Sequence, residues 1–220
     1  MIIVDPQWWP DEGAIERLNR AVSEEIITGK STEFTPSSRK ALSADIGMNA
    51  VFALLAPVAK LVPVVDANTL RTNQPGYDIL VGNQNPLKVQ VKCCTYVDCI
   101  AWGHTPDNPD APDLDFDVEI VVDAGCILDP RPAGTRSDGR QDIPMLPFVQ
   151  FYIIPGDVVR AEVARGAHVN KAGARLYWYK RVIKKGTKEE RCQWHDLPAW
   201  RNRFDVLDQM IASRLPAAVS

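Results

Sequence analysis

Alternating apolar and polar positions predict a β-hairpin in the first half of the chain. The turn-rich segment 82–86 separates a short apolar run from residues 87–92, which alternate strictly between apolar and polar side chains (LKVQVK). Such alternation has the period of a β-strand, and a short loop between two strands joins them as a hairpin. Because successive side chains leave a strand on opposite faces, Gln90 and Lys92 share its polar face. Both are expected within reach of Asp78, at the start of the first strand.

Apolar residues at helical spacing predict two helices before the hairpin. One covers residues 11–28. The other covers residues 35–56, with Thr35 as N-cap, Pro36 at the first helical position and Pro57 to end it. The hairpin is therefore preceded by a long amphipathic helix.

Further elements follow from the same periodicities. The pattern predicts a strand at 61–65, an alternating acidic and apolar strand at 115–123, a buried strand at 148–155, a helix at 156–165 capped by Asp157, and a final helix at 198–215, with loops at 66–76, 98–112 and 129–147. Pro63 favours an edge position for the first of these strands. Helices interspersed with strands predict an α/β domain whose mixed sheet is flanked by helices.

Composition narrows the class of protein. A chain of 220 residues suits one domain, and 45% hydrophobic with 24% charged residues is typical of a soluble globular protein. No apolar run reaches the length of a membrane span, and the N-terminus lacks a signal-peptide pattern, so a cytoplasmic protein is expected. The five cysteines lack metal-finger spacing, which favours reduced thiols.

The polar face of the hairpin carries the candidate chemistry. An aspartate, an amide oxygen and an ammonium that meet on a strand pair suit a hard divalent cation. Asp78 and Gln90 would supply oxygen ligands, and Lys92 would lower the pKa of a nearby water or hold a phosphate. The alternative is a surface hairpin with its polar residues in solvent, which is the ordinary pattern of a half-solvated antiparallel strand.

The spacing of Asp78 from the tripeptide Gln90-Val91-Lys92 resembles the PD-(D/E)xK nuclease superfamily, and in particular its homing and restriction-like endonucleases that read "YD" and then "QVK". The resemblance implies a single domain over residues 1–220, with a restriction-endonuclease-like core at about 38–160. The N-terminal helix and a basic, aromatic part at 161–220 would be additions.

The resemblance also implies a function, namely metal-dependent cleavage of DNA by phosphodiester hydrolysis. The cofactor would be Mg²⁺ or Mn²⁺, held by Asp78, Gln90, the carbonyl of Val91 and a carboxylate from helix 35–56. That helix lacks the family's glutamate, so Asp45 is the best substitute, and its alternative is a solvated helix residue. Lys92 would activate the attacking water. DNA would be the partner, and cutting both strands would need a homodimer or two successive nicks.

Two departures from the family pattern lie in the hairpin. Tyr77 stands where the name-giving proline would be, and Gln90 replaces an acidic residue. A neutral ligand leaves one less negative charge at the metal. Weaker binding, or transfer of the acidic role to another residue, is therefore expected.

Residues 158–191 carry ten Lys or Arg against three Asp or Glu, on a chain of net charge −3. A local basic segment can neutralise phosphates on an acidic protein, and aromatic residues beside it can stack on bases. The cations assigned to DNA are Lys88, Arg175, Lys180, Arg181, Lys184 and Lys185. The alternative is a solvated charged surface with Tyr177 and Tyr179 packed inward.

Three alternatives stay open. Asp117 and Glu119 share a strand face and either assist a second metal or are solvated. His104 reads as a surface or packing residue. The whole chain is either a nuclease, a catalytically inactive DNA-binding or protein-interaction module derived from one, or an unrelated α/β protein whose hairpin mimics the motif.

Overall fold

A computed structural model describes residues 36–70, 76–94, 99–104, 114–124, 149–166, 169–170, 173–179 and 183–214, with backbone alone at 36–42, 169–170 and 173–175. The helix expected at 11–28 and the loop expected at 129–147 lie outside these residues.

The described helices include three longer ones and several short ones. They are α2 (Pro36–Leu55), η1 (Val58–Lys60), α3 (Ala67–Leu70), α5 (Gly156–Arg165), α6 (Lys188–Cys192), η3 (Leu197–Trp200) and α7 (Phe204–Ala212). The strands are β1 (Val64–Asp66), β2 (Ile79–Val81), β3 (Leu87–Cys94), β4 (Cys99–His104), β5 (Val118–Asp123), β6 (Gln150–Pro155), β7 (Val169–Asn170) and β8 (Gly173–Tyr179). No helix among the described residues is long and apolar enough to cross a bilayer.

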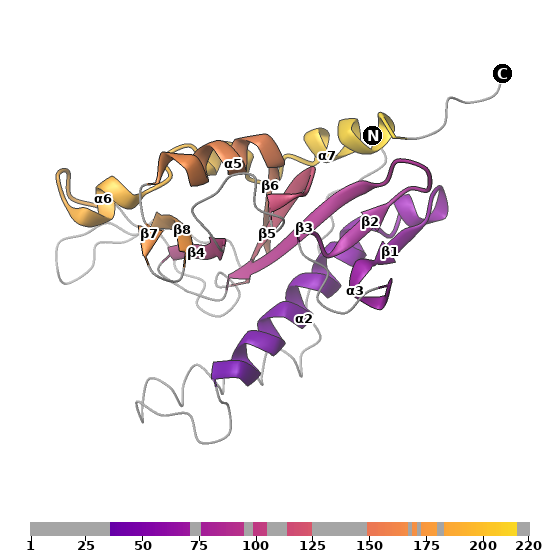
Figure 1. Ribbon diagram of the computed structural model, residues 1–220, viewed down its shortest axis with the longest axis horizontal. Coiled ribbons are helices and arrows are strands. Elements are labelled where there is room, and N and C mark those ends of the chain that lie inside the picture. Colours follow the sequence, from indigo (N-terminus) through magenta and orange to yellow (C-terminus); the bar gives the residue numbers. More distant parts are fainter. Residues whose placement is uncertain are drawn as a thin grey trace.

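The strands form two sheets in the described part of the chain. The larger has the order β1-β2-β3-β5-β6, with β3 and β5 parallel and the other neighbours antiparallel. The smaller has the order β4-β8-β7 and is antiparallel. Figure 1 shows the small sheet and α6 at one end of the molecule, and β1, β2 and α3 at the other. The predicted α/β architecture with a mixed, helix-flanked sheet is confirmed.

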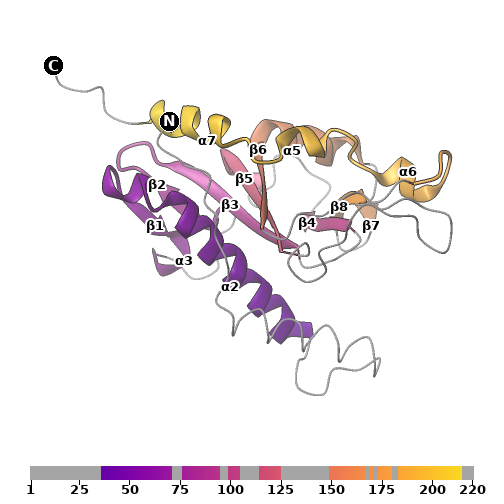
Figure 2. The ribbon, with the colours of Figure 1, turned by 180° about the vertical axis from the view of Figure 1, so that it is seen from behind.

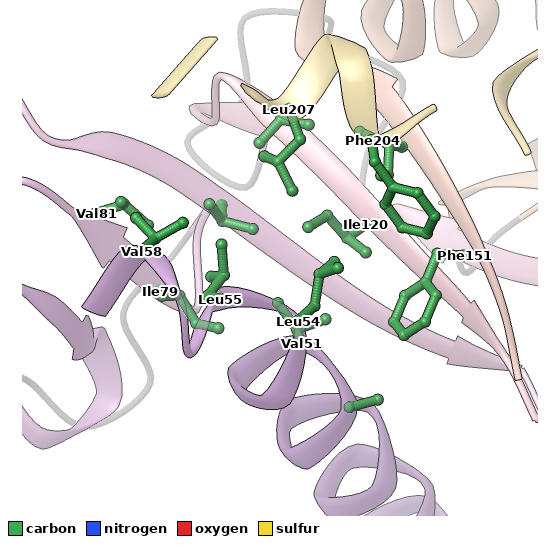
Figure 3. Packing of buried hydrophobic residues seen from close by; sticks show 14 of the residues in the cluster. Val51, Leu54, Leu55, Val58, Ile79, Val81, Ile120, Phe151, Phe204 and Leu207 are labelled. Atoms are coloured by element: carbon green, nitrogen blue, oxygen red, sulfur yellow. The ribbon is translucent and has the colours of Figure 1, made fainter. Parts of the chain in front are cut away.

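One face of the large sheet packs against α2 and α7. From the strands it presents Val89, Ile120 and Phe151, which share this core with Leu54 of α2 and Leu207 of α7. Figure 3 shows Ile120 between Leu54 and Leu207. The predicted start and end of α2 are confirmed within a residue. At Gly47 the helix approaches β3 so closely that an added Cβ would lie 2.9 Å from the Cβ of Cys93. The first turns of α2 extend beyond the strands (Figures 1 and 2).

The opposite face of the large sheet packs against the small sheet and α5. Its apolar residues include Val121 and Ile154, which share a cluster with Trp102 of β4, Trp178 of β8 and Val159 of α5. Alternate residues of each central strand thus enter two separate cores. Cys93 and Cys94 illustrate this, because the first packs against the α2 core and the second lies in the other core.

Four predictions about elements are wrong in detail. The strand at 61–65 is shorter and later, although β1 does lie at an edge. The loop at 66–76 contains α3. Asp157 is in the first turn of α5, whose N-cap is Pro155, so it does not cap the helix. The final helix begins at Phe204, because Pro198 belongs to the separate turn η3.

The largest error concerns residues 98–112, which were expected to be a loop. Cys99–His104 form β4, whose Trp102 and His104 are buried. The strand pairs with β8, far along the chain, so no local hairpin signal accompanies it.

Candidate active site

The hairpin of β2 and β3 brings Asp78 and Gln90 together. Ile79 pairs with Val89, so the next positions outward are Asp78 and Gln90 on the opposite face from the α2 core. The Gln90 side-chain amide donates a hydrogen bond to Asp78 Oδ2 at 2.5 Å. The backbone N–H of Val91 donates to the same oxygen at 2.8 Å. The predicted juxtaposition of these residues is therefore present, with Gln90 buried rather than exposed.

Asp78 lies in an environment that disfavours its charge. Burial raises the pKa of this carboxyl, and the Val91 N–H, the positive charge of Lys92 and the side chain of Asn68 oppose the rise only in part. A buried carboxylate gains from a nearby cation because the cation compensates the lost hydration. The hairpin thus holds a partly buried acid that a divalent ion would stabilise.

Lys92 is two residues further along β3, on the same face as Gln90. Its side chain is half-buried, and among the described residues it has no hydrogen-bond or ion-pair partner. Its positive charge lowers the pKa of Asp78 in part, against the larger effect of burial. The ammonium is therefore available to hold a water or a phosphate oxygen beside Asp78.

The donor set around Gln90 suits a hard cation. The Gln90 amide NH₂ bridges two oxygens, Asp78 Oδ2 and the Val91 carbonyl, the second at 3.2 Å. The Asp78 carboxylate, the Val91 carbonyl and, after rotation of the side chain, the Gln90 amide oxygen are the groups that would hold a cation here. Carboxylate, carbonyl and amide oxygens are the ligands that Mg²⁺ and Mn²⁺ prefer. The residues predicted as ligands thus fit the group, apart from Asp45.

Asp45 does not join this row of residues. It is exposed on α2, which packs on the other face of the large sheet, against Val91 and Cys93. Among the described residues its side chain makes no hydrogen bond or ion pair. The solvated alternative for Asp45 describes its surroundings.

Glu119 is the acidic residue that sequence reasoning placed wrongly. It lies beside Gln90 in the parallel pair of β3 and β5, and it is fully buried instead of solvated. Trp102 Nε1 donates a hydrogen bond to Glu119 Oε2 at 3.0 Å. His104 Nε2 lies 3.3 Å from the same oxygen and 3.1 Å from Oε1. Both partners come from β4, the strand that was read as a loop.

Asp117 has a structural role. Its Oδ2 accepts a hydrogen bond from the backbone N–H of Lys88 at 2.8 Å, and its Oδ1 lies 3.2 Å from the guanidinium of Arg214. Asp117 therefore ties the start of β3 to the end of the α7 region. Each of its two oxygens thus has a protein partner among the described residues.

The cations assigned to DNA are only partly described. Lys184 and Lys185 are exposed. Lys88 pairs with Asp115 at 2.7 Å and lies over the ring of Tyr77. The side chains of Arg175, Lys180 and Arg181 lie outside the described residues.

Tyr177 and Tyr179 are partly buried and lie on the other face of β8 from the core residues. Leu176 and Trp178, which alternate with them, are buried, and the rings of the two tyrosines are nearly parallel, 8° apart. Half-exposed parallel rings on a strand are suited to stacking on bases.

Among the described residues, no three His, Cys, Asp or Glu side chains lie close enough together to hold a metal ion. Comparison of the chain with protein-family models, curated proteins and solved structures gives no match. The function is therefore inferred from the geometry of the hairpin and its neighbours.

Proposed function

We propose that this protein is a metal-dependent DNA endonuclease that hydrolyses phosphodiester bonds at the β2–β3 hairpin. One observation carries the proposal: the partly buried Asp78, the Gln90 amide and Lys92 share one face of a strand pair, and Lys92 has no hydrogen-bond or ion-pair partner among the described residues. This is the constellation that the PD-(D/E)xK resemblance implies for Asp78, Gln90 and Lys92. A partly buried acid whose pKa is raised by burial and that has a cation nearby is a functional-site candidate.

The fold supports the same reading. In the resembling superfamily the core begins with a helix followed by three strands, and α2, β1, β2 and β3 occur here in that order, with the strands antiparallel. We therefore also propose that the large sheet is restriction-endonuclease-like. The small sheet that follows β3 would be an addition to that core.

Each residue has a definite task in the proposed reaction. Asp78, with the Val91 carbonyl and the Gln90 amide oxygen, would hold Mg²⁺ or Mn²⁺. When bound, the cation supplies polarisation of the phosphate and a water of lowered pKa. Lys92 Nζ would hold the attacking water and stabilise the negative charge that develops on the phosphate. The water oxygen bonds to phosphorus, the bond to the sugar oxygen breaks, and that oxygen takes up a proton.

The test is cleavage of supercoiled, linear and single-stranded DNA with Mg²⁺, Mn²⁺ or EDTA. We expect metal-dependent cutting that Asp78→Asn and Lys92→Ala each reduce by about 10²-fold or more, as loss of one electrostatic group at a reacting centre does. The controls are Asp205→Asn and Lys60→Ala, which remove the same charges at exposed positions. Accumulation of nicked plasmid before linear product would indicate successive nicks, and direct linear product a homodimer. Equal activity of Lys92→Ala and wild type would overturn the assignment.

A specific observation favours a second candidate, a catalytically inactive DNA-binding module derived from a nuclease. Gln90 satisfies Asp78 with its own NH₂ group, so the hairpin is hydrogen-bonded without a metal. In that case DNA binding would persist in EDTA, and no substrate would be cut. Mobility-shift assays of wild type and a Lys184→Ala/Lys185→Ala variant distinguish the two, because binding without cutting supports only the module.

A further inference from the structure

The row of side chains that begins with Asp78 and Gln90 continues onto the next strand. Gln90 and Glu119 are Cα partners in the parallel pair of β3 and β5, so their side chains leave the sheet on the same face as close neighbours. Asp78 lies on the other side of Gln90 and accepts a hydrogen bond from its side-chain amide. Gln90 is thus flanked by two acids, one on each adjacent strand.

Glu119 is buried in a way that leaves one oxygen unsatisfied. The side chain has no exposed surface, and Oε1 has no hydrogen-bond partner among the described residues, while Trp102 donates to Oε2. His104 Nε2 lies 3.1 Å from Oε1 but in an arrangement that does not form a hydrogen bond. An orphaned buried carboxylate oxygen costs free energy unless a water or a cation meets it. Its side chain lies on the face that carries Gln90.

The neighbourhood also explains why residue 90 is neutral. A carboxylate at that position would lie one strand away from Glu119 and next to Asp78, both with reduced access to water. Like charges at such spacing destabilise each other strongly when buried. The neutral Gln90 removes one negative charge from the row, and Glu119 supplies one. The row therefore carries the same charge as the superfamily motif, which has its acid at position 90.

We propose that Glu119 is the second carboxylate of the cation site, which holds the divalent ion together with Asp78 in place of the acid absent at position 90. The proposal rests on the nuclease function proposed above and names a ligand for it. The acidic role has moved one strand across the sheet, from β3 to β5. Trp102 and His104 hold the Glu119 side chain through their contacts with its carboxylate.

The experiment exchanges the two functional groups and measures Mn²⁺ binding by calorimetry on the full chain, without DNA. Glu119→Gln is expected to weaken Mn²⁺ binding at least tenfold. Gln90→Glu combined with Glu119→Gln returns the acid to β3 and is expected to restore the affinity to within about threefold of wild type. The matched control is Asp123→Asn, a buried acid on the same strand and face whose register partners are Cys94 and Gln150. It should leave Mn²⁺ affinity unchanged.

Each result decides the proposal. An unchanged affinity in folded Glu119→Gln overturns it. A loss that the double variant does not restore also overturns it, because Glu119 then acts through packing and not as a ligand. If wild type binds Mn²⁺ and Asp78→Asn abolishes the binding while Glu119→Gln does not, the nuclease proposal stands and this inference fails. If wild type binds no Mn²⁺, both fail.

A second measurement covers the case in which Glu119→Gln does not fold. The Trp102 indole N–H bonds directly to Glu119, so Mn²⁺ at the proposed site lies within a few side-chain lengths of it. In wild type its nuclear magnetic resonance signal, identified by its absence in Trp102→Phe, should be the first tryptophan signal that substoichiometric Mn²⁺ broadens. Earlier broadening of another indole signal overturns the proposal.

Discussion

The two faces of the large sheet follow different rules although the same strands build both. The face beneath α2 and α7 buries apolar side chains of the strands, such as Val89, Ile120 and Phe151. The other face buries Gln90, Glu119, Asp123 and Gln150 among its apolar neighbours.

The difference separates two kinds of contribution. Apolar burial stabilises the fold in proportion to the area removed from water. A buried polar group contributes little net stability and costs free energy whenever a partner is missing. The concentration of polar groups on one face, next to Lys92, therefore supports the proposed site on that face, while the opposite face holds the sheet together.

The largest effect is expected on the apolar face. Phe151→Ala removes a buried ring that packs edge-on against Phe204, with centroids 6.0 Å apart, and should lower the free energy of unfolding by about 3–5 kcal/mol. Urea denaturation measures it. Leu61→Ala, at an exposed apolar residue, is the control and should change stability by less than about 0.5 kcal/mol. A loss below about 1 kcal/mol for Phe151→Ala would break the contrast between the faces.

A smaller loss is expected on the polar face. His104→Ala leaves the buried Glu119 with Trp102 as its remaining partner, and removal of one partner of a buried polar pair costs about 2–3 kcal/mol. His195→Ala removes an imidazole that is 59% exposed, so it serves as the matched control. Thermal denaturation of both variants compares them directly. Equal melting temperatures would show that the buried pair adds nothing to stability.

Asp78→Asn should raise stability at neutral pH. Because burial raises the folded-state pKa of Asp78, the folded protein holds this proton more tightly than the unfolded chain does. Stability contributed at low pH is therefore lost as pH rises from the unfolded-state pKa through the folded-state pKa. The variant should match wild type at a pH below the unfolded-state pKa of an aspartate, about 3.9, and exceed it once the pH is above the raised folded-state pKa of Asp78. Melting curves across this pH range measure it, and Mg²⁺ should stabilise wild type alone.

The smallest effect is expected where the polar face opens to solvent. Lys88 and Asp115 form an ion pair with one-third and two-thirds of their side chains exposed, so a double-mutant cycle should give about 0.2–1 kcal/mol. The coupling should shrink as salt rises. A coupling energy above about 2 kcal/mol, or one that does not change with salt, would contradict the solvent exposure of this ion pair. Such values are expected only of a group as buried as Glu119.

The parts of the fold that local patterns determine could be predicted from the sequence. The hairpin could be predicted because its two strands and its turn, with Gly82 at a φ of +101°, are contiguous in the sequence. The bounds of α2 follow from Pro36 and Pro57 for the same reason. β4 was not predicted because its hydrogen-bonding partner, β8, is distant in the sequence and because a stretch rich in proline and aspartate follows it. The alternation of Ile100, Trp102 and His104 is the signal that would have found it.

The candidate site was predictable to the same extent. Asp78, Gln90 and Lys92 belong to the hairpin, so their spacing placed them correctly. Glu119 looked solvated because acidic and apolar residues alternate on β5, as they do on a strand with one wet face. Glu119 is buried by Trp102 and His104, which belong to the small sheet. The sequence of residues 115–123 alone does not show that another sheet packs over this face.

The pairing of β4 with β8 has a consequence for the order in which the protein assembles. Trp102 is opposite Leu176, a partner distant along the chain, whereas β2 and β3 meet through a tight turn. Contacts between distant segments form late, because closing a long loop costs entropy before any contact compensates it. The hairpin with Asp78 and Gln90 should therefore exist before Glu119 is enclosed. A cation that binds both acids would then link an early-forming part of the protein to a late one.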